Sequence, residues 1–168
     1  MTAKEEALTV GRLRELLDYH PETGEFRWRV HRADNARSGS VAGSLNHGGY
    51  WRVSIQGHTY LAHRLAWLYV HGEWPTTGID HKNGVTEDNR IANLREATQM
   101  ENGGNKRKAH INSKTGLLGT SWHSPTKKFL AQIQLDGKIT RLGYFPTAEQ
   151  AHQAYLVAKR ELHPFCTI

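Results

Sequence analysis

A polar, basic segment that begins with two glycines divides this chain of 168 residues into two parts. Residues 103–115 read GGNKRKAHINSKT, a composition typical of an exposed linker. A chain divided at this point forms two small domains, and neither of them can bury a large core. We therefore expect a first domain at residues 1–102, a basic linker at residues 103–114 and a second domain at residues 115–168.

The net charge of +6 is concentrated in the second part of the chain. Residues 1–102 hold 12 Lys and Arg against 13 Asp and Glu, whereas residues 103–168 hold 10 against 3. Clustered Lys and Arg bind polyanions by releasing the counterions condensed on them. Nucleic acid is favoured over a membrane surface, because no strongly amphipathic helix accompanies the charge. The expected partner is nucleic acid, and no membrane partner is expected.

Targeting features and cysteine content indicate the cellular compartment and the kinds of cross-link that the chain can form. The chain has no apolar run near the ~20 residues that a membrane span needs, and the sequence MTAKEEALTVGRLREL carries charges where a secretory signal needs an apolar stretch. We therefore expect the protein in the cytoplasm. The single cysteine, Cys166, can form neither an intrachain disulfide nor a cysteine-rich zinc site, so no structural zinc is expected.

The first part of the chain mixes helical and strand patterns. Leucines at helical spacing predict a short helix over residues 8–18, and the stretches FRWRV and YWRVSI within residues 26–55 predict short strands of a small antiparallel sheet. Residues 60–70 (YLAHRLAWLYV) return to helical spacing and stop before Gly72 and Pro75.

The second part predicts a sheet followed by one helix. Residues 117–123, 129–135 and 139–144 read as three strands, and the pair Asp136-Gly137 is typical of a tight hairpin turn between the last two. The middle strand alternates between an apolar face and a mostly polar face. Thr147, with Gln150 three residues later, predicts the start of a helix that lies on the apolar face.

Chemistry is concentrated in residues 79–105, IDHKNGVTEDNRIANLREATQMENGGN. Adjacent side chains at the end of a short strand point in different directions, so Asp80 can hold a hard cation while His81 faces the reacting group. Hydrolysis of a phosphodiester needs both functions, because a cation stabilises charge on the phosphate and a neutral imidazole takes a proton from water. A lone Asp-His pair is more often a cap or a surface hydrogen bond, so the catalytic interpretation depends on the other motif residues nearby in the sequence.

This pattern, DH followed by NR..NL and T..EN, resembles the HNH (ββα-metal) homing and phage endonucleases. The resemblance implies that His81 is the general base, that Asp80 is a metal ligand and that Asn93 ties the loop and helps to orient the base. The last motif position is ordinarily His and here is Asn102, as in one subgroup of phage and intron-encoded enzymes. Two oxygen ligands plus water imply one Mg²⁺ or Mn²⁺ ion per active site.

In that family two strands and a helix, here about residues 76–105, hold the ion. The resemblance therefore requires residues 93–102 to bring a helix back over the hairpin, with Leu94, Ala97 and Met100 at the right spacing to be its buried side.

Upstream, the stretches TGEFRWR, GYWRV and AHRLAW also resemble phage HNH proteins. The pair His63-Arg64 matches an HR pair seen before the motif, and for Arg64 phosphate contact and a stabilising role remain alternatives. The histidines without motif support, which are interpreted as surface or core residues, are His58, His71, His110 and His152.

The second part, with the stretch LGYFPTAEQAHQAY as its most specific match, resembles the Apetala-two (ethylene-response-factor) DNA-binding domain. In that family the sheet enters the major groove. The predicted DNA contacts are Ser121, His123, Gln132, Gln134 and Arg141, with Lys127 and Lys128 near phosphates. Ser121 and Gln134 stand where the family has arginines, so guanine-rich specificity is not expected, and Trp122 has the parity of a core residue. A basic domain that only adds non-specific affinity is the alternative.

The fold class expected from these patterns is α+β: a small N-terminal antiparallel sheet and helix, then a ββα-metal motif, then a three-stranded antiparallel sheet packed on one C-terminal helix. The function expected is an HNH endonuclease that hydrolyses phosphodiesters in duplex DNA. One site cuts one strand, so a monomer nicks, and a homodimer could break both strands. The alternatives are a non-catalytic DNA-binding regulator with a remnant nuclease module and a nuclease that acts on RNA or on packaging intermediates.

Overall fold

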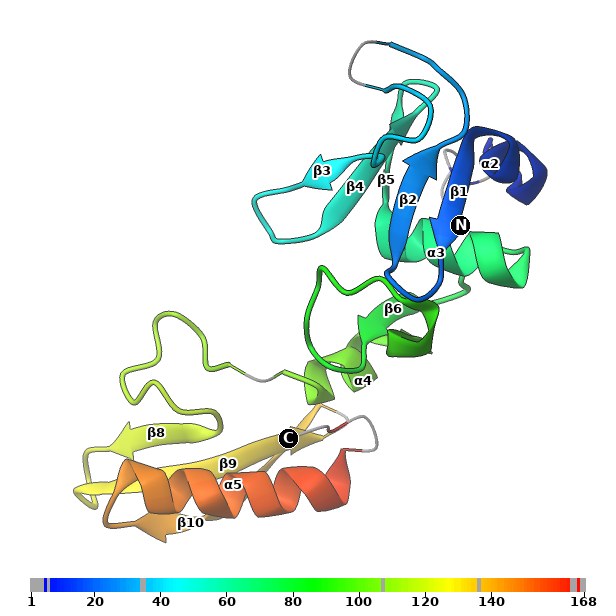
Figure 1. Cartoon of the computed structure of the whole chain (residues 1–168). Coiled ribbons are helices and arrows are strands. Elements are labelled where there is room, and N and C mark those ends of the chain that lie inside the picture. The colour runs from blue at the N-terminus through cyan, green and yellow to red at the C-terminus, as the bar shows by residue number, and fades with distance from the viewer. Residues whose placement is uncertain are drawn as a thin grey trace. The chain divides into compact units, whose positions relative to one another are not determined.

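The fold is mixed α+β, with small antiparallel sheets and helices, as the sequence predicts (Figure 1). The structure is a computed structural model that describes residue 5 and residues 7–33, 36–106, 108–135, 137–163 and 166. It divides into two compact units, Met1–Ala97 and Thr98–Ile168. The sequence analysis sets the domain boundary a few residues later, and the assignment of a nuclease domain, a linker and a DNA-binding domain stays a prediction.

The first unit consists of short elements that pair only with near neighbours in the sequence. The strands form two hairpins, β1 with β2 and β6 with β7, and a three-stranded sheet of order β3-β4-β5, all antiparallel. The elements are α2 (Val10–Leu16), β1 (Leu17–His20), β2 (Glu25–Trp28), β3 (Ser44–Leu45), β4 (Trp51–Ile55), β5 (His58–Leu61), α3 (Ala62–His71), β6 (Gly78–His81), the 3₁₀ helix η1 (Ile91–Asn93) and β7 (Leu94–Ala97).

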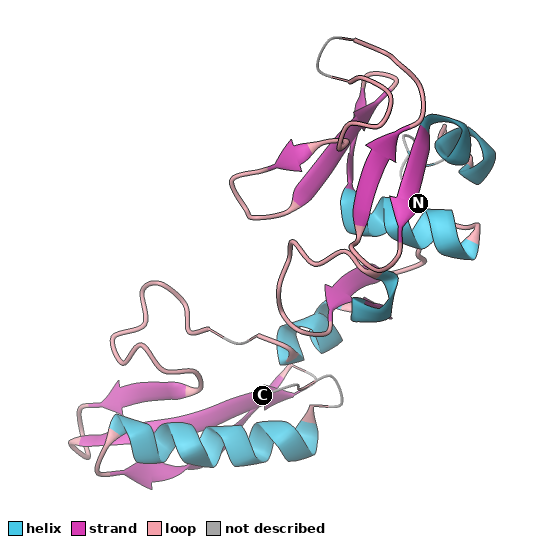
Figure 2. Ribbon diagram, in the orientation of Figure 1, coloured by secondary structure: helices cyan, strands magenta, loops and turns pink. Residues whose placement is uncertain are grey.

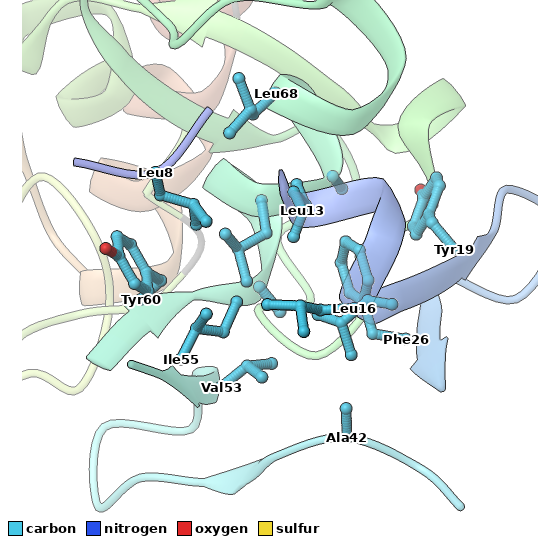
Figure 3. Packing of buried hydrophobic residues seen from close by; sticks show 14 of the residues in the cluster. Leu8, Leu13, Leu16, Tyr19, Phe26, Ala42, Val53, Ile55, Tyr60 and Leu68 are labelled. Atoms are coloured by element: carbon cyan, nitrogen blue, oxygen red, sulfur yellow. The ribbon is translucent and has the colours of Figure 1, made fainter. Parts of the chain in front are cut away.

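One hydrophobic core joins these elements. Leu13 from α2, Phe26 from β2 and Val53 from β4 are at most 1% exposed and belong to one cluster, which Figure 3 shows at close range. A fully buried side chain of this size contributes about 1.5–3 kcal/mol. The core therefore fixes the N-terminal elements against α3, whose buried residues include Leu65 and Leu68.

Two of the predicted helices in this unit are shorter than the sequence suggests. Helix α2 ends at Leu16, because residues 17–20 pair with residues 25–28 as a hairpin. Helix α3 begins at Ala62, because Tyr60 and Leu61 pair with β4. Over such short apolar stretches, helical and strand periodicity cannot be told apart.

The predicted helix over residues 93–102 is wrong in its first half. Leu94 and Ala97 are buried, but they lie in strand β7, which pairs with β6, and Met100 is 55% exposed. A helix begins only after Thr98, whose hydroxyl accepts a hydrogen bond from the Glu101 backbone nitrogen while the Glu101 carboxylate accepts one from the Thr98 backbone nitrogen. This reciprocal capping box fixes the start of α4 and limits β7 to four residues.

The second unit is a three-stranded sheet covered on one face by a helix (Figure 2). Its elements are α4 (Gln99–Gly104), β8 (Thr120–His123), β9 (Lys128–Leu135), β10 (Lys138–Phe145) and α5 (Ala148–Leu162), with strand order β10-β9-β8. Thr147 caps α5 by accepting from the Gln150 backbone nitrogen at 3.2 Å. Ala131 and Ile133 of the predicted apolar strand face are at most 2% exposed.

Two predictions from the sequence concern the hairpin turn and the edge strand of this unit. Leu135 and Lys138 pair across the β9–β10 hairpin, while Asp136 of the predicted turn lies outside the described residues. Trp122 was expected in the core but is 47% exposed, because it lies on β8, an edge strand. Its ring packs against that of Phe129, with centroids 5.0 Å apart. Among the described residues, no helix is long and apolar enough to cross a membrane.

Candidate active site

The β6–β7 hairpin buries the carboxylate of Asp80 and gives it a cationic partner. Asp80 is 4% exposed and stands directly opposite Arg95 in the antiparallel register. Nε and Nη2 of Arg95 donate to Oδ2 of Asp80 at 2.8 and 2.7 Å. An uncompensated charge in so buried a position would be strongly destabilising, so this pair is what allows a carboxylate here.

His81, the last residue of β6, is 5% exposed and is held by a side chain that the sequence analysis missed. Oδ1 of Asn89 lies 3.2 Å from Nε2 of the ring, and Nδ2 of Asn89 donates to the Glu87 carbonyl at 3.2 Å. The second bond identifies the atom that faces His81 as the amide oxygen, which can only accept. Nε2 therefore carries the proton of the neutral ring, and Nδ1 is the nitrogen that can accept a proton.

The surroundings also keep this imidazole uncharged. Burial lowers the pKa of His81 below its ordinary value, and the Asn89 hydrogen bond and the charge of Asp80 oppose the shift without reversing it. The ring is therefore neutral at neutral pH, which is the state in which an imidazole can accept a proton.

Asn93, the central Asn of the sequence motif, fastens the loop between β6 and η1. Its Oδ1 accepts from the Asn83 backbone nitrogen at 3.0 Å, and its Nδ2 donates to Oδ1 of Asn83 at 3.0 Å and to the Asp88 carbonyl at 2.8 Å. The hydrogen bond between an asparagine side chain and the His81 ring involves Asn89, four residues earlier. Asn93 therefore ties the loop, as the resemblance implies, and its part in orienting the base stays a prediction.

The same loop is anchored from outside by the N-terminal sheet elements. The Tyr19 hydroxyl in β1 donates to the Asn89 carbonyl at 2.7 Å, and the Thr86 hydroxyl donates to the Gly49 carbonyl in the β3–β4 turn at 2.7 Å. Gly24 in the β1–β2 turn approaches so closely that a Cβ there would lie 2.5 Å from the Arg90 backbone nitrogen. The loop that carries Asn89 is therefore held on two sides.

Two rings, those of His63 and Tyr50, lie beside the candidate base. The His63 ring from the first turn of α3 lies 5.1 Å from the His81 ring at 87°, and the Tyr50 ring lies 5.7 Å from His63 and 6.2 Å from His81. His63 is 5% exposed, and its Nδ1 is the one buried side-chain nitrogen or oxygen for which the described part of the chain offers no hydrogen-bond partner. Burial, followed by the nearby His81 and Arg64, lowers the pKa of His63 to about 3.

Arg64, for which phosphate contact was one of two alternatives, is bonded within its own unit. Nε pairs with the Glu5 carboxylate at 2.7 Å, and the two terminal nitrogens donate to the carbonyls of Thr77 and Pro75 at 3.1 and 3.4 Å. These bonds link Glu5 to the segment that leads into β6, the strand that contains Asp80. They favour the stabilising role over phosphate contact.

Asn102 lies in α4, in the second compact unit, whereas Asp80 and His81 lie in the first. The pairing of Asp80 with Asn102 around an ion stays a prediction. The donor set fits a hard cation, because a carboxylate oxygen and an amide oxygen are ligands that Mg²⁺ and Mn²⁺ prefer. The residues that the structure describes include no group of three or more His, Cys, Asp and Glu that could hold a metal ion.

The predicted DNA-contacting residues of the second unit share one sheet face. Cross-strand register places Arg141 opposite Gln132 and His123 opposite Lys128. Strand parity then assigns five predicted contacts to this face: Ser121, His123, Gln132, Gln134 and Arg141. Lys127 lies in the β8–β9 turn and is exposed, as is Lys128.

Part of this face is covered by its own side chains. The rings of His123 and Tyr144 lie 4.8 Å apart on the two strands that flank β9, and Leu130 of β9 is only 7% exposed. Ser121, Gln134 and Arg141 remain exposed. Whether these residues contact DNA stays a prediction.

Comparison with known proteins gives one partial match and one distant structural likeness. Residues 60–103, about a quarter of the chain, match the family model of HNH endonuclease, and this segment contains Asp80, His81, Asn89, Asn93 and Asn102. No curated protein matches the chain. A solved structure of DNA binding and cleavage by the HNH homing endonuclease I-HmuI is 22% identical, covers 82% of this chain and 76% of that chain, and has a TM-score of 0.41.

Proposed function

We propose that this protein is a metal-dependent endonuclease that hydrolyses phosphodiester bonds in duplex DNA and nicks one strand per event. The observation that carries the proposal is the state of His81, a buried, neutral imidazole whose Nε2 is fixed by Asn89 and which follows the buried Asp80 in strand β6. The match of residues 60–103 to the HNH endonuclease model supports the same chemistry.

In this proposal, Nδ1 of His81 accepts the proton of the attacking water, because Nε2 is already protonated toward Asn89. Asn89 keeps the ring in that tautomer, and Asn93 keeps the loop that carries Asn89 in place. Asp80 and Asn102 would hold one Mg²⁺ or Mn²⁺ ion. Such an ion supplies charge stabilisation at the phosphate and the leaving oxygen. Arg95, which pairs with the Asp80 carboxylate, would share it with such an ion.

The second unit binds duplex DNA in this proposal, with its exposed polar sheet face toward the bases. Ten Lys and Arg against three Asp and Glu in residues 103–168 support a phosphate-binding role. Gln134 and Arg141 are exposed on that face and have side chains that can read base edges. Lys127 and Lys128 are suited to contact the backbone.

Relaxation of a supercoiled plasmid tests this function. We expect open-circular product with Mg²⁺, none with EDTA, and none from His81→Ala, while DNA binding by that variant stays within about twofold of wild type, because His81 is assigned to chemistry and not to affinity. His71→Ala is the matched control, since His71 is an exposed histidine at the far end of α3. Equal loss of binding and cleavage in His81→Ala would contradict the assigned role.

A non-catalytic DNA-binding regulator is the second candidate, and the Asp80–Arg95 ion pair favours it. A remnant metal site would be expected to satisfy its carboxylate with a protein cation, as Arg95 does here. The plasmid assay separates the two functions. Full DNA binding without metal-dependent nicking would support the regulator.

A further inference from the structure

The orphaned nitrogen of His63 calls for a physical explanation. An apolar side chain would fill the same buried position in α3 without leaving a polar atom unsatisfied, and Leu65 and Leu68 of the same helix do so nearby. A buried nitrogen without a partner is a cost to folding. A histidine at this position is therefore better explained by what its ring does for its neighbours than by stability.

The neighbours of His63 are the rings of His81 and Tyr50. The His63 and His81 planes meet at 87°, the edge-to-face arrangement that aromatic rings prefer. Tyr50 contacts both rings, at 64° to His63 and 51° to His81. Its backbone nitrogen donates to Oδ1 of Asn46 at 2.9 Å, so the turn that carries Tyr50 is itself ordered.

A hydrogen bond at one edge does not by itself fix the plane of an imidazole. The terminal torsion of a histidine side chain is broad and roughly two-fold, and rotation about it exchanges the nitrogen that faces a substrate for a carbon. The Asn89 bond at Nε2 restrains one edge of His81. The rings of His63 and Tyr50, which lie against His81, oppose this rotation.

A proton relay from His81 to His63 does not fit the structure. With its pKa lowered to about 3, His63 stays neutral over the range in which His81 would work. Arg64, the next residue, adds a positive charge that further disfavours a charged His63. The charged groups facing His81, Asp80 and Asp88, lie on β6 and its following loop.

We propose that His63 and Tyr50 are positioning residues, whose rings hold the imidazole plane of His81 in the orientation that the Asn89 hydrogen bond requires. The inference rests on the proposed function for its catalytic consequence, but the packing of His81 can be tested without it.

The kinetic test compares His63→Ala, His63→Phe and His63→Gln. Misplacement of a catalytic group by about 1 Å lowers rates on the order of 100-fold. We therefore expect His63→Ala and His63→Gln to lower kcat for nicking by about 10- to 100-fold with KM within about twofold, and His63→Phe to stay within about threefold of wild type. Equal loss in His63→Phe and His63→Ala would overturn a packing role for the ring, and so would wild-type rates in all three.

A spectroscopic test keeps the inference separate from the nuclease proposal. In protein labelled with ¹³C at histidine Cε1, free of metal and DNA, the His81 signal should shift and broaden in His63→Ala and in Tyr50→Ala but stay in place in His71→Ala. Tyr50 is only half-buried, so its variant should fold even if His63→Ala does not. An unchanged His81 signal in folded Tyr50→Ala would overturn the proposal. A changed signal in a protein without nicking activity would support it while refuting the proposed function.

Discussion

Acid should destabilise the first unit through His63, by an amount that the structure sets. The ordinary pKa of histidine is 6.5, and burial lowers that of His63 to about 3. Between these two pKa values, the unfolded chain therefore binds a proton at His63 that the folded chain does not bind. The contribution of a neutral His63 to stability is complete above about pH 6.5 and is lost as the pH falls from there toward about 3.

The expected loss follows from the pH interval. One pH unit in this range corresponds to about 1.4 kcal/mol for one proton. Lowering the pH from 7.5 to 4.5 should therefore cost about 3 kcal/mol, a sizeable part of the roughly 5–15 kcal/mol that stabilises a typical domain. His63 is 5% exposed, so solvent screening reduces this figure little.

Urea unfolding at pH 7.5 and pH 4.5 measures this loss. Four of the five tryptophans, Trp28, Trp51, Trp67 and Trp74, lie in the first unit, so tryptophan fluorescence follows mainly that unit. The lower pH stays clear of Asp88, whose pKa the hydrogen bond from Arg90 lowers to about 2.

The matched comparison is His63→Phe, which keeps the ring and removes the proton site. Burial of His81 also favours acid unfolding, but that effect is present in both proteins. Wild type should lose about 3 kcal/mol more than the variant between the two pH values. Equal losses would refute the reasoning, because they would mean that His63 is protonated without unfolding.

Three further outcomes are expected. Asn89→Ala should remove the hydrogen bond at Nε2 of His81 and lower the free energy of unfolding, measured in urea, by about 1–3 kcal/mol. It should also lower the nicking rate in the plasmid assay by at least about tenfold, and unchanged nicking would contradict the orienting bond. Gly119→Ala should destabilise the second unit, because φ is +70° and a Cβ would lie 1.9 Å from the Tyr155 ring. A left-handed backbone costs about 1–2 kcal/mol and overpacking about 1–3 kcal/mol, so a melting temperature equal to that of wild type would refute this prediction. Lys128→Ala should reduce the slope of log binding constant against log salt by about 1, and an unchanged slope would remove Lys128 from the phosphate contacts.

The second unit could be predicted closely because its patterns are long. Strand β9 alternates over eight residues, and the Thr147 cap marks the start of a helix of 15 residues. In the first unit, β1, β5 and β7 each have four residues, too few for alternation to outweigh helical spacing. The strand β7 was missed for this reason, and Thr98, the N-cap of the following helix α4, was the signal that could have corrected it.

The candidate site could be predicted only as far as local spacing reaches. Asp80 and His81 are neighbours in the sequence, and a motif can find them. The Arg95 partner of Asp80 depends on the β6–β7 register, and the Asn89 bond depends on how a loop folds back. Asn89 was visible in the sequence as part of the NR pair, but nothing in the spacing alone assigned it a task.

The anchoring of the β6–η1 loop limits how far the cutting element can be separated from its scaffold. A β6–β7 hairpin with its loop, transplanted into another protein, would leave behind the Tyr19 hydroxyl and the Gly49 carbonyl that restrain it. It would also leave behind the Tyr50 and His63 rings. The graft would carry the motif residues intact, yet its imidazole would sample several orientations, so engineering this element would require moving the first 77 residues along with it.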